Sequence, residues 1–224
     1  MARRAGTADV ARGAGVVTRA IGIDFDNTIV SYDELMRRVA VDRGLIGEAE
    51  GRTKRDVRDR IRELPDGDIE WQKLQALVYG PMMRDAQPIA GVEEFIRRCR
   101  HAGIPVFIVS HKTEYAGYDE TRTNLRTAAL EWMTMHHFFE ADGLDLGRDH
   151  VYFESTRTGK IDRIRRIGCS HFIDDLEEVF LEPSFPANVE KILYAPQATS
   201  VSANGGRLIS SWQALCDDFF DGRS

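Results

Sequence analysis

Short apolar runs alternate with amphipathic segments along most of the chain. The apolar runs are rich in Ile, Val, Phe and Tyr and are too short for buried helices, so they favour β-strands. They cover residues 20–25, 104–109, 151–153, 171–173 and 189–194. Strands that alternate with helices are typical of a parallel sheet covered by helices on both faces. The pattern therefore predicts an α/β fold.

The amphipathic segments repeat apolar residues at helical spacing. Val92, Phe95, Ile96 and Cys99 share one helical face, and Gly103 ends this predicted helix just before the strand at 104–109. The same spacing predicts further helices around residues 125–132, 161–168 and 212–219. Most of these helices fall between two predicted strands, as the crossover connections of a parallel sheet require.

Residues 31–90, which we call the helical insert, interrupt this alternation. They contain three helical patterns and no convincing strand. The clearest helix is predicted to begin with Asp68 as its N-cap and to end at Gly80-Pro81. We therefore expect a core made of residues 19–30 and 91–224, with 31–90 as a separate all-helical lobe. Residues 1–18 are rich in Ala, Gly and Arg without apolar periodicity and are predicted to form a flexible leader.

The bulk composition narrows the classes of function. With 42% hydrophobic and 29% charged residues, the chain has the composition of a globular protein. Its formal net charge of −6 argues against nucleic acid or an anionic membrane as a partner. The three cysteines are far apart and form no CxxC pair, and no secretory or membrane-spanning apolar stretch occurs, so we expect a cytoplasmic protein without structural disulfides.

Polar side chains follow three of the predicted strands. Residues 20–23 of the first lead into Asp24 and Asp26, Ser110 follows the second, and Asp174 with Asp175 follow the strand at 171–173. Any one of these residues could simply cap a turn. Because ligands of an open parallel sheet bind beyond the carboxyl ends of its strands, however, the set is expected to meet at one rim.

Four carboxylates at one rim repel one another unless a cation is bound, and hard oxygen ligands suit Mg²⁺. The sequence therefore predicts a magnesium site and, with it, phosphoryl-transfer chemistry. Asp24 can attack phosphorus, and Asp26 can protonate the leaving alcohol and later activate water. Phosphate oxygens can be bound by Thr28, Ser110 and Lys160, the last of which lies near a predicted helix N-terminus.

The run Asp24-Phe25-Asp26-Asn27-Thr28, followed by Ser110, Lys160 and the pair Asp174-Asp175, resembles the four motifs of the haloacid dehalogenase superfamily, in order. The resemblance covers about residues 20–200 and implies a Rossmann-like three-layer core, with the helical insert as a small cap between the first and second motifs. It also implies an aspartyl-phosphate on Asp24 and acid/base work by Asp26. Mg²⁺ would be bound by Asp24, the Asp26 carbonyl and Asp174, with Asp175 as an outer or water-mediated ligand.

Several alternatives remain open at this stage. Lys112 follows Ser110 closely and competes with Lys160 as the phosphate-binding lysine, because only 14 residues separate Lys160 from Asp174. Glu177 and Glu178 are interpreted as the acidic first turn of a helix rather than as metal ligands. Candidate substrate contacts in the helical insert are Arg37, Arg38, Lys54, Arg55, Trp71, Gln72, Gln75 and Tyr79.

The leading hypothesis is a Mg²⁺-dependent phosphatase of a small phosphorylated metabolite, such as a sugar phosphate. True haloacid dehalogenases lack an acid two residues after the nucleophile, so Asp26 favours phosphate esters. The alternatives are a phosphotransferase or phosphomutase that uses the same aspartyl-phosphate, and a catalytically silent binding domain of the same fold.

Overall fold

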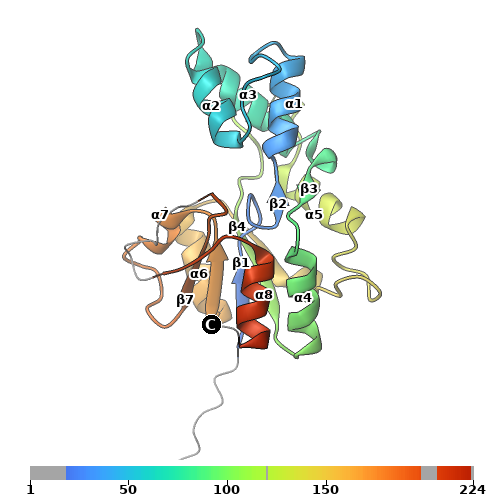
Figure 1. Ribbon diagram of the computed structural model, residues 1–224, viewed down its shortest axis with the longest axis vertical. Coiled ribbons are helices and arrows are strands. Elements are labelled where there is room, and N and C mark those ends of the chain that lie inside the picture. Colours follow the sequence, from blue (N-terminus) through green and yellow to red (C-terminus); the bar gives the residue numbers. More distant parts are fainter. Residues whose placement is uncertain (1–18, 120, 198–205, 223–224) are drawn as a thin grey trace, which may run out of the picture.

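The computed structural model describes residues 19–119, 121–197 and 206–222. The leader expected at residues 1–18 lies outside this part of the chain. Figure 1 shows a lower body built around a sheet and an upper group of helices that stands away from it. Among the described residues, no helix has both the length and the apolar character needed to cross a membrane.

The lower body contains a sheet of six strands in the order β5-β4-β1-β6-β7-β8, and every neighbouring pair is parallel. The α/β prediction is therefore confirmed. The strands are β1 (Ile21–Ile23), β4 (Val106–His111), β5 (Val151–Glu154), β6 (His171–Asp174), β7 (Glu190–Tyr194) and β8 (Arg207–Ile209). Five of them lie within or overlap predicted runs, whereas β8 is a three-residue edge strand that the apolar pattern does not predict.

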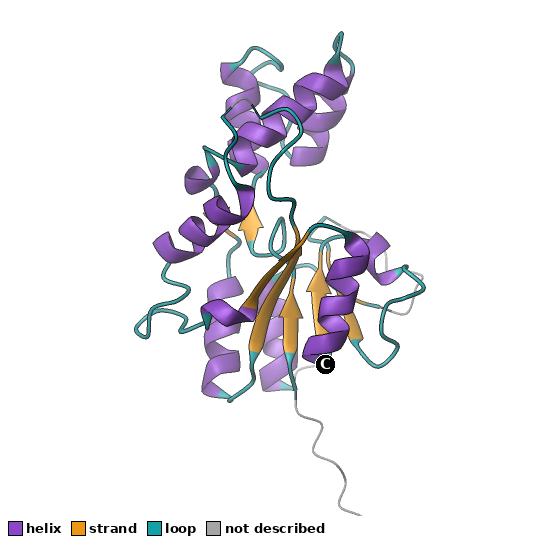
Figure 2. Ribbon diagram, turned by 180° about the vertical axis from the view of Figure 1, so that it is seen from behind, coloured by secondary structure: helices purple, strands orange, loops and turns teal. Residues whose placement is uncertain are grey.

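Alternate residues of the strands enter two separate hydrophobic clusters. Ile108 and Ile192 belong to the cluster that packs against α4 (Val92–His101), α5 (Leu125–Met135) and α8 (Trp212–Asp221). Their neighbours Val109 and Leu193 belong to the cluster on the other face, with α6 (Arg157–Ile167) and α7 (Glu177–Phe180). The period of two therefore produces three layers, and Figures 1 and 2 show the sheet from its two sides.

Gly22 of β1 lies where no side chain fits. A Cβ atom at this position would be 2.5 Å from Cδ2 of Phe172 and 2.9 Å from Sγ of Cys169, both of which are buried. The central strand can therefore pack against the α6 face only with glycine at this position.

Replacing Gly22 with Ala is expected to destabilise the protein by about 1–3 kcal/mol, the usual cost of overpacking a core. Urea unfolding of the Gly22→Ala variant measures this cost. Gly117→Ala is the matched control, because a Cβ atom there meets nothing within 4 Å. Equal stability of Gly22→Ala and the native protein would show that Phe172 can move aside.

The helical insert contains α1 (Asp33–Asp42), α2 (Lys54–Arg62) and α3 (Gly67–Tyr79), which pack on one another, followed by the short helix η1 (Met83–Asp85). Two details of its prediction are wrong. A two-residue strand, β3 (Gln87–Pro88), pairs antiparallel with β2 (Val30–Ser31) at the base of the insert. Helix α3 begins two residues before the expected start, with Asp66 rather than Asp68 at the N-cap.

The early start of α3 follows from a close approach of the backbone. A Cβ atom on Gly67 would lie 2.3 Å from the carbonyl oxygen of Ile61, so only glycine lets α3 begin directly against the end of α2. One further short helix, η2 (Arg148–His150), precedes β5 in the core.

Candidate active site

The three central strands bring the predicted acidic residues and Ser110 to one rim. Asp24 directly follows β1, Ser110 lies near the end of β4, and Asp174 is the last residue of β6. The backbone N–H of Asp24 donates to the carbonyl oxygen of Ile173 at 2.8 Å, which extends the β1–β6 pairing into the site. Asp24, Ser110 and Asp174 are at most 4% exposed.

A tight turn after β1 directs the Asp26 side chain. Asn27 has a φ of 60°, a left-handed conformation that asparagine tolerates better than most residues. The backbone N–H groups of Ile29 and Val30 both donate to the carbonyl oxygen of Phe25, at 3.0 and 3.1 Å. These bonds fix the turn between the two aspartates and the start of the helical insert.

Lys160 lies between two of the carboxylates. Its Nζ atom is 2.6 Å from Oδ1 of Asp24 and 2.6 Å from Oδ2 of Asp174. Helix α6 places it there: the Thr156 hydroxyl caps the helix by accepting from the N–H of Gly159, and Lys160 follows in the first turn. Lys112, the competing lysine, contacts Asp26 instead.

The short interval between Lys160 and Asp174 has a geometric cause. From Lys160 the chain descends along α6 by about 10 Å, turns at Gly168, and returns along β6 by about 10 Å. The two side chains therefore meet at the same rim, and 14 residues suffice.

Burial controls the protonation of this cluster. Burial raises the pKa of Asp24 from 3.8 to about 7, with Asp174 and Asp26 adding to the shift and Lys160 opposing it. Burial also raises the pKa of Asp175 well above its usual value, and the neighbouring Asp24 and Asp174 charges raise it further. Burial alone would lower the pKa of Lys160, but the two carboxylates that it contacts outweigh this effect and raise it.

The donor set fits a hard divalent cation. Asp24, Asp174 and Asp175 each offer one carboxylate oxygen, and these oxygens lie within 4.8 Å of one another. All three donors are oxygen, and Asp175 is only partly buried, which leaves access for water. Such a site matches the preference of Mg²⁺ for a few carboxylates together with water.

Mg²⁺ is expected to stabilise the protein more at high pH than at low pH. The raised pKa of Asp24 means that the native state binds more protons than the unfolded state between about pH 4 and pH 7. Without metal, stability therefore falls as the pH rises through this window. Mg²⁺ needs the ionised carboxylates, and at about 100 times its Kd it would add about 2.7 kcal/mol.

The measurement is the melting temperature with and without Mg²⁺ at about pH 5 and about pH 8. The increase should be larger at the higher pH and absent in Asp174→Asn. Equal increases at both pH values, or an increase that survives in Asp174→Asn, would place the bound cation elsewhere.

Two buried hydroxyl groups have no hydrogen-bond partner among the described residues: Oγ of Ser110 and Oγ1 of Thr28. Ser110 lines the cavity that contains Asp24, so its hydroxyl is free to donate to a bound ligand. Thr28 is fully buried and does not line this cavity. Its carbonyl oxygen accepts from Nε1 of Trp212 at 3.0 Å, which ties the turn after β1 to α8.

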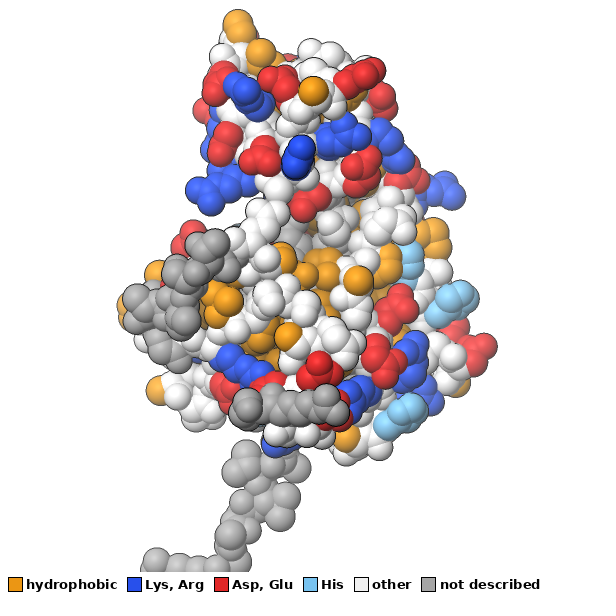
Figure 3. Space-filling view, in the orientation of Figure 1, with side chains coloured by type: hydrophobic (Ala, Val, Ile, Leu, Met, Phe, Trp, Pro, Cys, Tyr) orange, Lys and Arg blue, Asp and Glu red, His pale blue; other side chains and the backbone are white. Residues whose placement is uncertain are grey.

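The cavity at the rim has a volume of about 200 Å³. It is lined by both signs of charge and by residues of the core and the helical insert: Asp24, Asp26, Asn27, Lys54, Tyr79, Ser110, His111, Arg157, Lys160, Asp175, Leu176 and Val179. A wider hollow of about 690 Å³ shares Asn27 and Asp175 with it and reaches Arg55 of the insert. On the face shown in Figure 3, charges of both signs are mixed over the insert.

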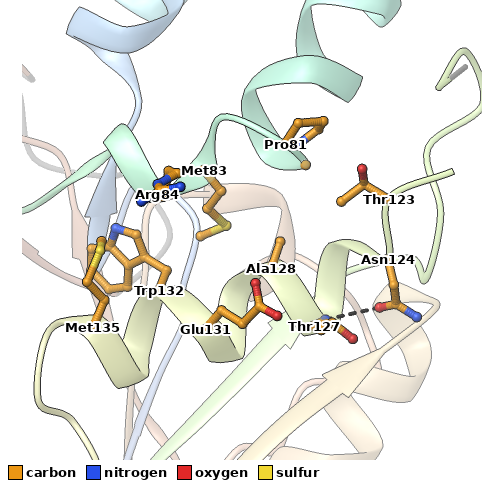
Figure 4. A pocket seen from close by; sticks show the side chains of 11 residues that line it. Pro81, Met83, Arg84, Thr123, Asn124, Thr127, Ala128, Glu131, Trp132 and Met135 are labelled. Carbon is orange, nitrogen blue, oxygen red and sulfur yellow. Dashed lines mark hydrogen bonds between the residues drawn. The ribbon is translucent and has the colours of Figure 1, made fainter. Parts of the chain in front are cut away.

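Another hollow, of about 450 Å³, lies between η1 and α5. Figure 4 shows Trp132 and Met83 in its lining, with the exposed charges of Arg84 and Glu131 around them. It contains none of the clustered carboxylates. The smaller cavity at the rim is therefore the better candidate for catalysis.

The structure places the residues whose roles the sequence left open. Glu177 and Glu178 form the acidic first turn of α7, as expected. Of the candidate insert residues, Lys54 and Tyr79 line the cavity at the rim, and Arg55 lines the adjoining hollow. Trp71 is buried in the core of the insert instead.

Sequence reasoning missed Tyr32. Its hydroxyl donates to Oδ1 of Asp26 at 2.6 Å, although the residue lies just outside the motif and follows the short strand β2. No periodicity marks it, because its role depends on the turn at Asn27, which brings the chain back beside Asp26.

Several solved structures are similar to this chain in fold. A HAD family hydrolase from Deinococcus radiodurans R1, with bound phosphate and sodium, is 17% identical; the match covers 90% of this chain and 95% of that one, with a TM-score of 0.54. CbbY from Rhodobacter sphaeroides, in complex with phosphate, is 14% identical with 88% and 96% covered and a TM-score of 0.50. A dehalogenase is 14% identical with 88% and 95% covered and a TM-score of 0.51.

Searches against protein-family models and curated proteins found no match. The parallel sheet with an acidic rim defines an α/β fold with a site beyond its strand ends. Over about nine tenths of the chain, the fold is similar to that of the HAD family hydrolase, of CbbY and of the dehalogenase. The resemblance in the four motifs and the similarity in fold therefore agree.

Proposed function

We propose that the protein is a Mg²⁺-dependent phosphohydrolase that cleaves a small-molecule phosphate monoester through an aspartyl-phosphate on Asp24. The observation that carries the proposal is the grouping at one rim of a buried carboxylate, Asp24, with a second acid two residues later and with Lys160 bridging to Asp174. A phosphate ester needs an attacking oxygen, a proton donor and positive charge, and this site offers all three.

Each side chain has a distinct task in this proposal. An oxygen of Asp24 forms a bond to phosphorus while the bond from phosphorus to the leaving oxygen breaks, and Asp26 gives that oxygen its proton. Asp26 then takes a proton from the water that hydrolyses the aspartyl-phosphate. The Ser110 hydroxyl donates to a phosphoryl oxygen, and Thr28 shapes the turn from within. Lys160 holds Asp24 in place and contributes positive charge.

Asp24, the Asp26 carbonyl and Asp174 would hold Mg²⁺, with Asp175 beside them. The ion would offset charge between the carboxylates and the phosphate when bound. The helical insert, as a cap over the rim, would exclude water and contact the leaving group through Lys54 and Tyr79.

The size of the site supports a small substrate. The cavity of about 200 Å³ opens beside a hollow of about 690 Å³, enough for a phosphate and a compact leaving group. CbbY from Rhodobacter sphaeroides, with the same fold, has been crystallised with phosphate and with xylulose-(1,5)bisphosphate. We therefore place a phosphorylated metabolite, such as a sugar phosphate, first among the candidates.

A panel of phosphorylated metabolites incubated with Mg²⁺ tests the proposal by release of inorganic phosphate. Short-chain 2-chloro acids belong in the same panel, because a dehalogenase shares the fold. Phosphate release from at least one ester is expected. Halide release without phosphate release would overturn the proposal, and an isomerised phosphate ester without free phosphate would identify a mutase.

A further inference from the structure

The carboxylate of Asp26 is held by two side chains outside the four motifs. The Tyr32 hydroxyl donates to its Oδ1 atom at 2.6 Å. Nζ of Lys112 lies 3.0 Å from Oδ1 and 2.9 Å from Oδ2. Tyr32 therefore contacts Oδ1 alone, whereas Lys112 contacts both oxygens and fixes the orientation of the carboxyl group.

Lys112 is unusual for its burial. Its side chain is only 3% exposed, and Asp26 is its sole ion-pair partner in the described part of the chain. An ammonium group is costly to bury without a carboxylate nearby. The position of Lys112 and the position of the Asp26 carboxylate are therefore set together.

The backbone of Lys112 is fixed at both ends. Its N–H donates to the carbonyl oxygen of Glu154 at 2.9 Å, and its own carbonyl oxygen accepts from Nε of Arg126 at 3.0 Å. Its ammonium group also lies 5.7 Å from the ring centre of Phe25, next to Asp26 in the chain. Lys112 can thus act as a rigid support rather than as a mobile surface lysine.

Tyr32 approaches from the helical insert. The residue immediately precedes α1, and its side chain is fully buried. The ring of Tyr79, at the end of α3, packs edge-on against it with 4.5 Å between ring centres. Nζ of Lys112 lies 5.3 Å from the same Tyr79 ring. The insert and the core therefore meet around Asp26.

We propose that Tyr32 and Lys112 are positioning residues that hold the Asp26 carboxyl group, Tyr32 through Oδ1 and Lys112 through both oxygens, so that Oδ2, which Tyr32 does not contact, faces the leaving group and carries its proton. This inference rests on the proposed phosphohydrolase function. In the step concerned, Asp24 bonds to phosphorus, the phosphorus–oxygen bond of the ester breaks with its electron pair on the leaving oxygen, and the proton moves from Asp26 to that oxygen. A misplaced Asp26 slows only esters whose leaving group needs the proton.

The test compares kcat/KM for p-nitrophenyl phosphate and for phenyl phosphate. The p-nitrophenolate ion leaves readily without a proton, whereas phenolate is the poorer leaving group. Because kcat/KM covers the reaction only up to formation of the aspartyl-phosphate, it isolates the proton-donor role of Asp26. Lys112→Met and Tyr32→Phe should each lose about 10- to 100-fold with phenyl phosphate and less than about 3-fold with p-nitrophenyl phosphate. Asp26→Asn should show the same split, more strongly.

Matched controls separate this role from general damage. Lys191→Met removes a partly buried lysine that contacts the Phe180 carbonyl oxygen, and Tyr152→Phe alters a partly buried tyrosine of β5. Both should retain native kcat/KM for the two esters. Equal losses with both esters in Lys112→Met and Tyr32→Phe would overturn the inference while leaving the proposed function standing.

A crystal structure of Lys112→Met supplies a readout that does not depend on activity. We expect the Asp26 side chain to leave the position it has in the native protein. An unmoved Asp26 side chain would overturn the inference. If the native protein cleaves neither aryl phosphate nor any ester of the metabolite panel, the proposed function fails, and the proton-donor role inferred here fails with it.

Discussion

Replacing Asp24 with Asn is expected to lower phosphate release by at least about 10⁴-fold, the scale of loss when an enzyme loses its nucleophile. The amide keeps the shape of the side chain but cannot attack phosphorus. Lys160 retains its 2.6 Å contact with Asp174, so we expect the variant to remain folded. The measurement is inorganic phosphate released from the best ester of the metabolite panel.

The control for this substitution is Asp68→Asn on helix α3, where the native side chain is 74% exposed. It should release phosphate at the native rate. Activity of Asp24→Asn above about a tenth of the native value would mean that another oxygen attacks phosphorus, and Asp174 would be the next candidate. If the Asp24→Asn variant is folded and inactive but still gains thermal stability with Mg²⁺, its loss of activity comes from the missing nucleophile and not from loss of the metal.

The residues at the rim of the sheet could be predicted because the ends of the strands can be recognised in the sequence. Asp24, Ser110 and Asp174 each lie at the end of an apolar run, and parallel strands bring such ends together. Lys160 was accessible to the same reasoning, since the apolar spacing of Ile161 and Ile164 predicts a helix there, although α6 begins earlier, at Arg157, with Gly159 inside its first turn. All four residues are positioned by strands or helices that the spacing of apolar residues in the sequence predicts.

Other parts of the fold and of the site depend on tertiary contacts, which the spacing of apolar residues along the sequence does not predict. Strand β8 has only three residues, begins with Arg207, and gains its place by pairing with β7. Tyr32 reaches Asp26 because a left-handed turn at Asn27 reverses the chain. Lys112 was visible as a candidate, but its partner was not, because burial beside Asp26 is a tertiary property. The start of α3 likewise follows from packing of Gly67 on α2.

The chemistry of the site likewise depends partly on features visible in the sequence and partly on tertiary structure. The order and spacing of the acidic residues point to phosphoryl transfer, whereas the protonation of the cluster follows from burial. The pKa of Asp24 rises to about 7 chiefly because the side chain is buried, and the Lys160 ammonium limits that rise. A cation between the carboxylates therefore favours the ionised form of Asp24, the proposed nucleophile, near neutral pH.

Replacing Lys160 with Met is expected to cost about 3–5 kcal/mol of stability at about pH 8, the scale for breaking a buried ion pair. Without the ammonium group, which opposes the raised pKa of Asp24, that pKa rises further, so the native state keeps a proton that the unfolded state releases. Stability of the variant should therefore fall steeply as the pH rises, and the cost should shrink toward about pH 5. Mg²⁺ should recover part of the loss, because it supplies positive charge between the same carboxylates. Urea unfolding at both pH values measures the effect, with Lys191→Met as control. A cost that is the same at both pH values and unaffected by Mg²⁺ would assign Lys160 to packing rather than to charge.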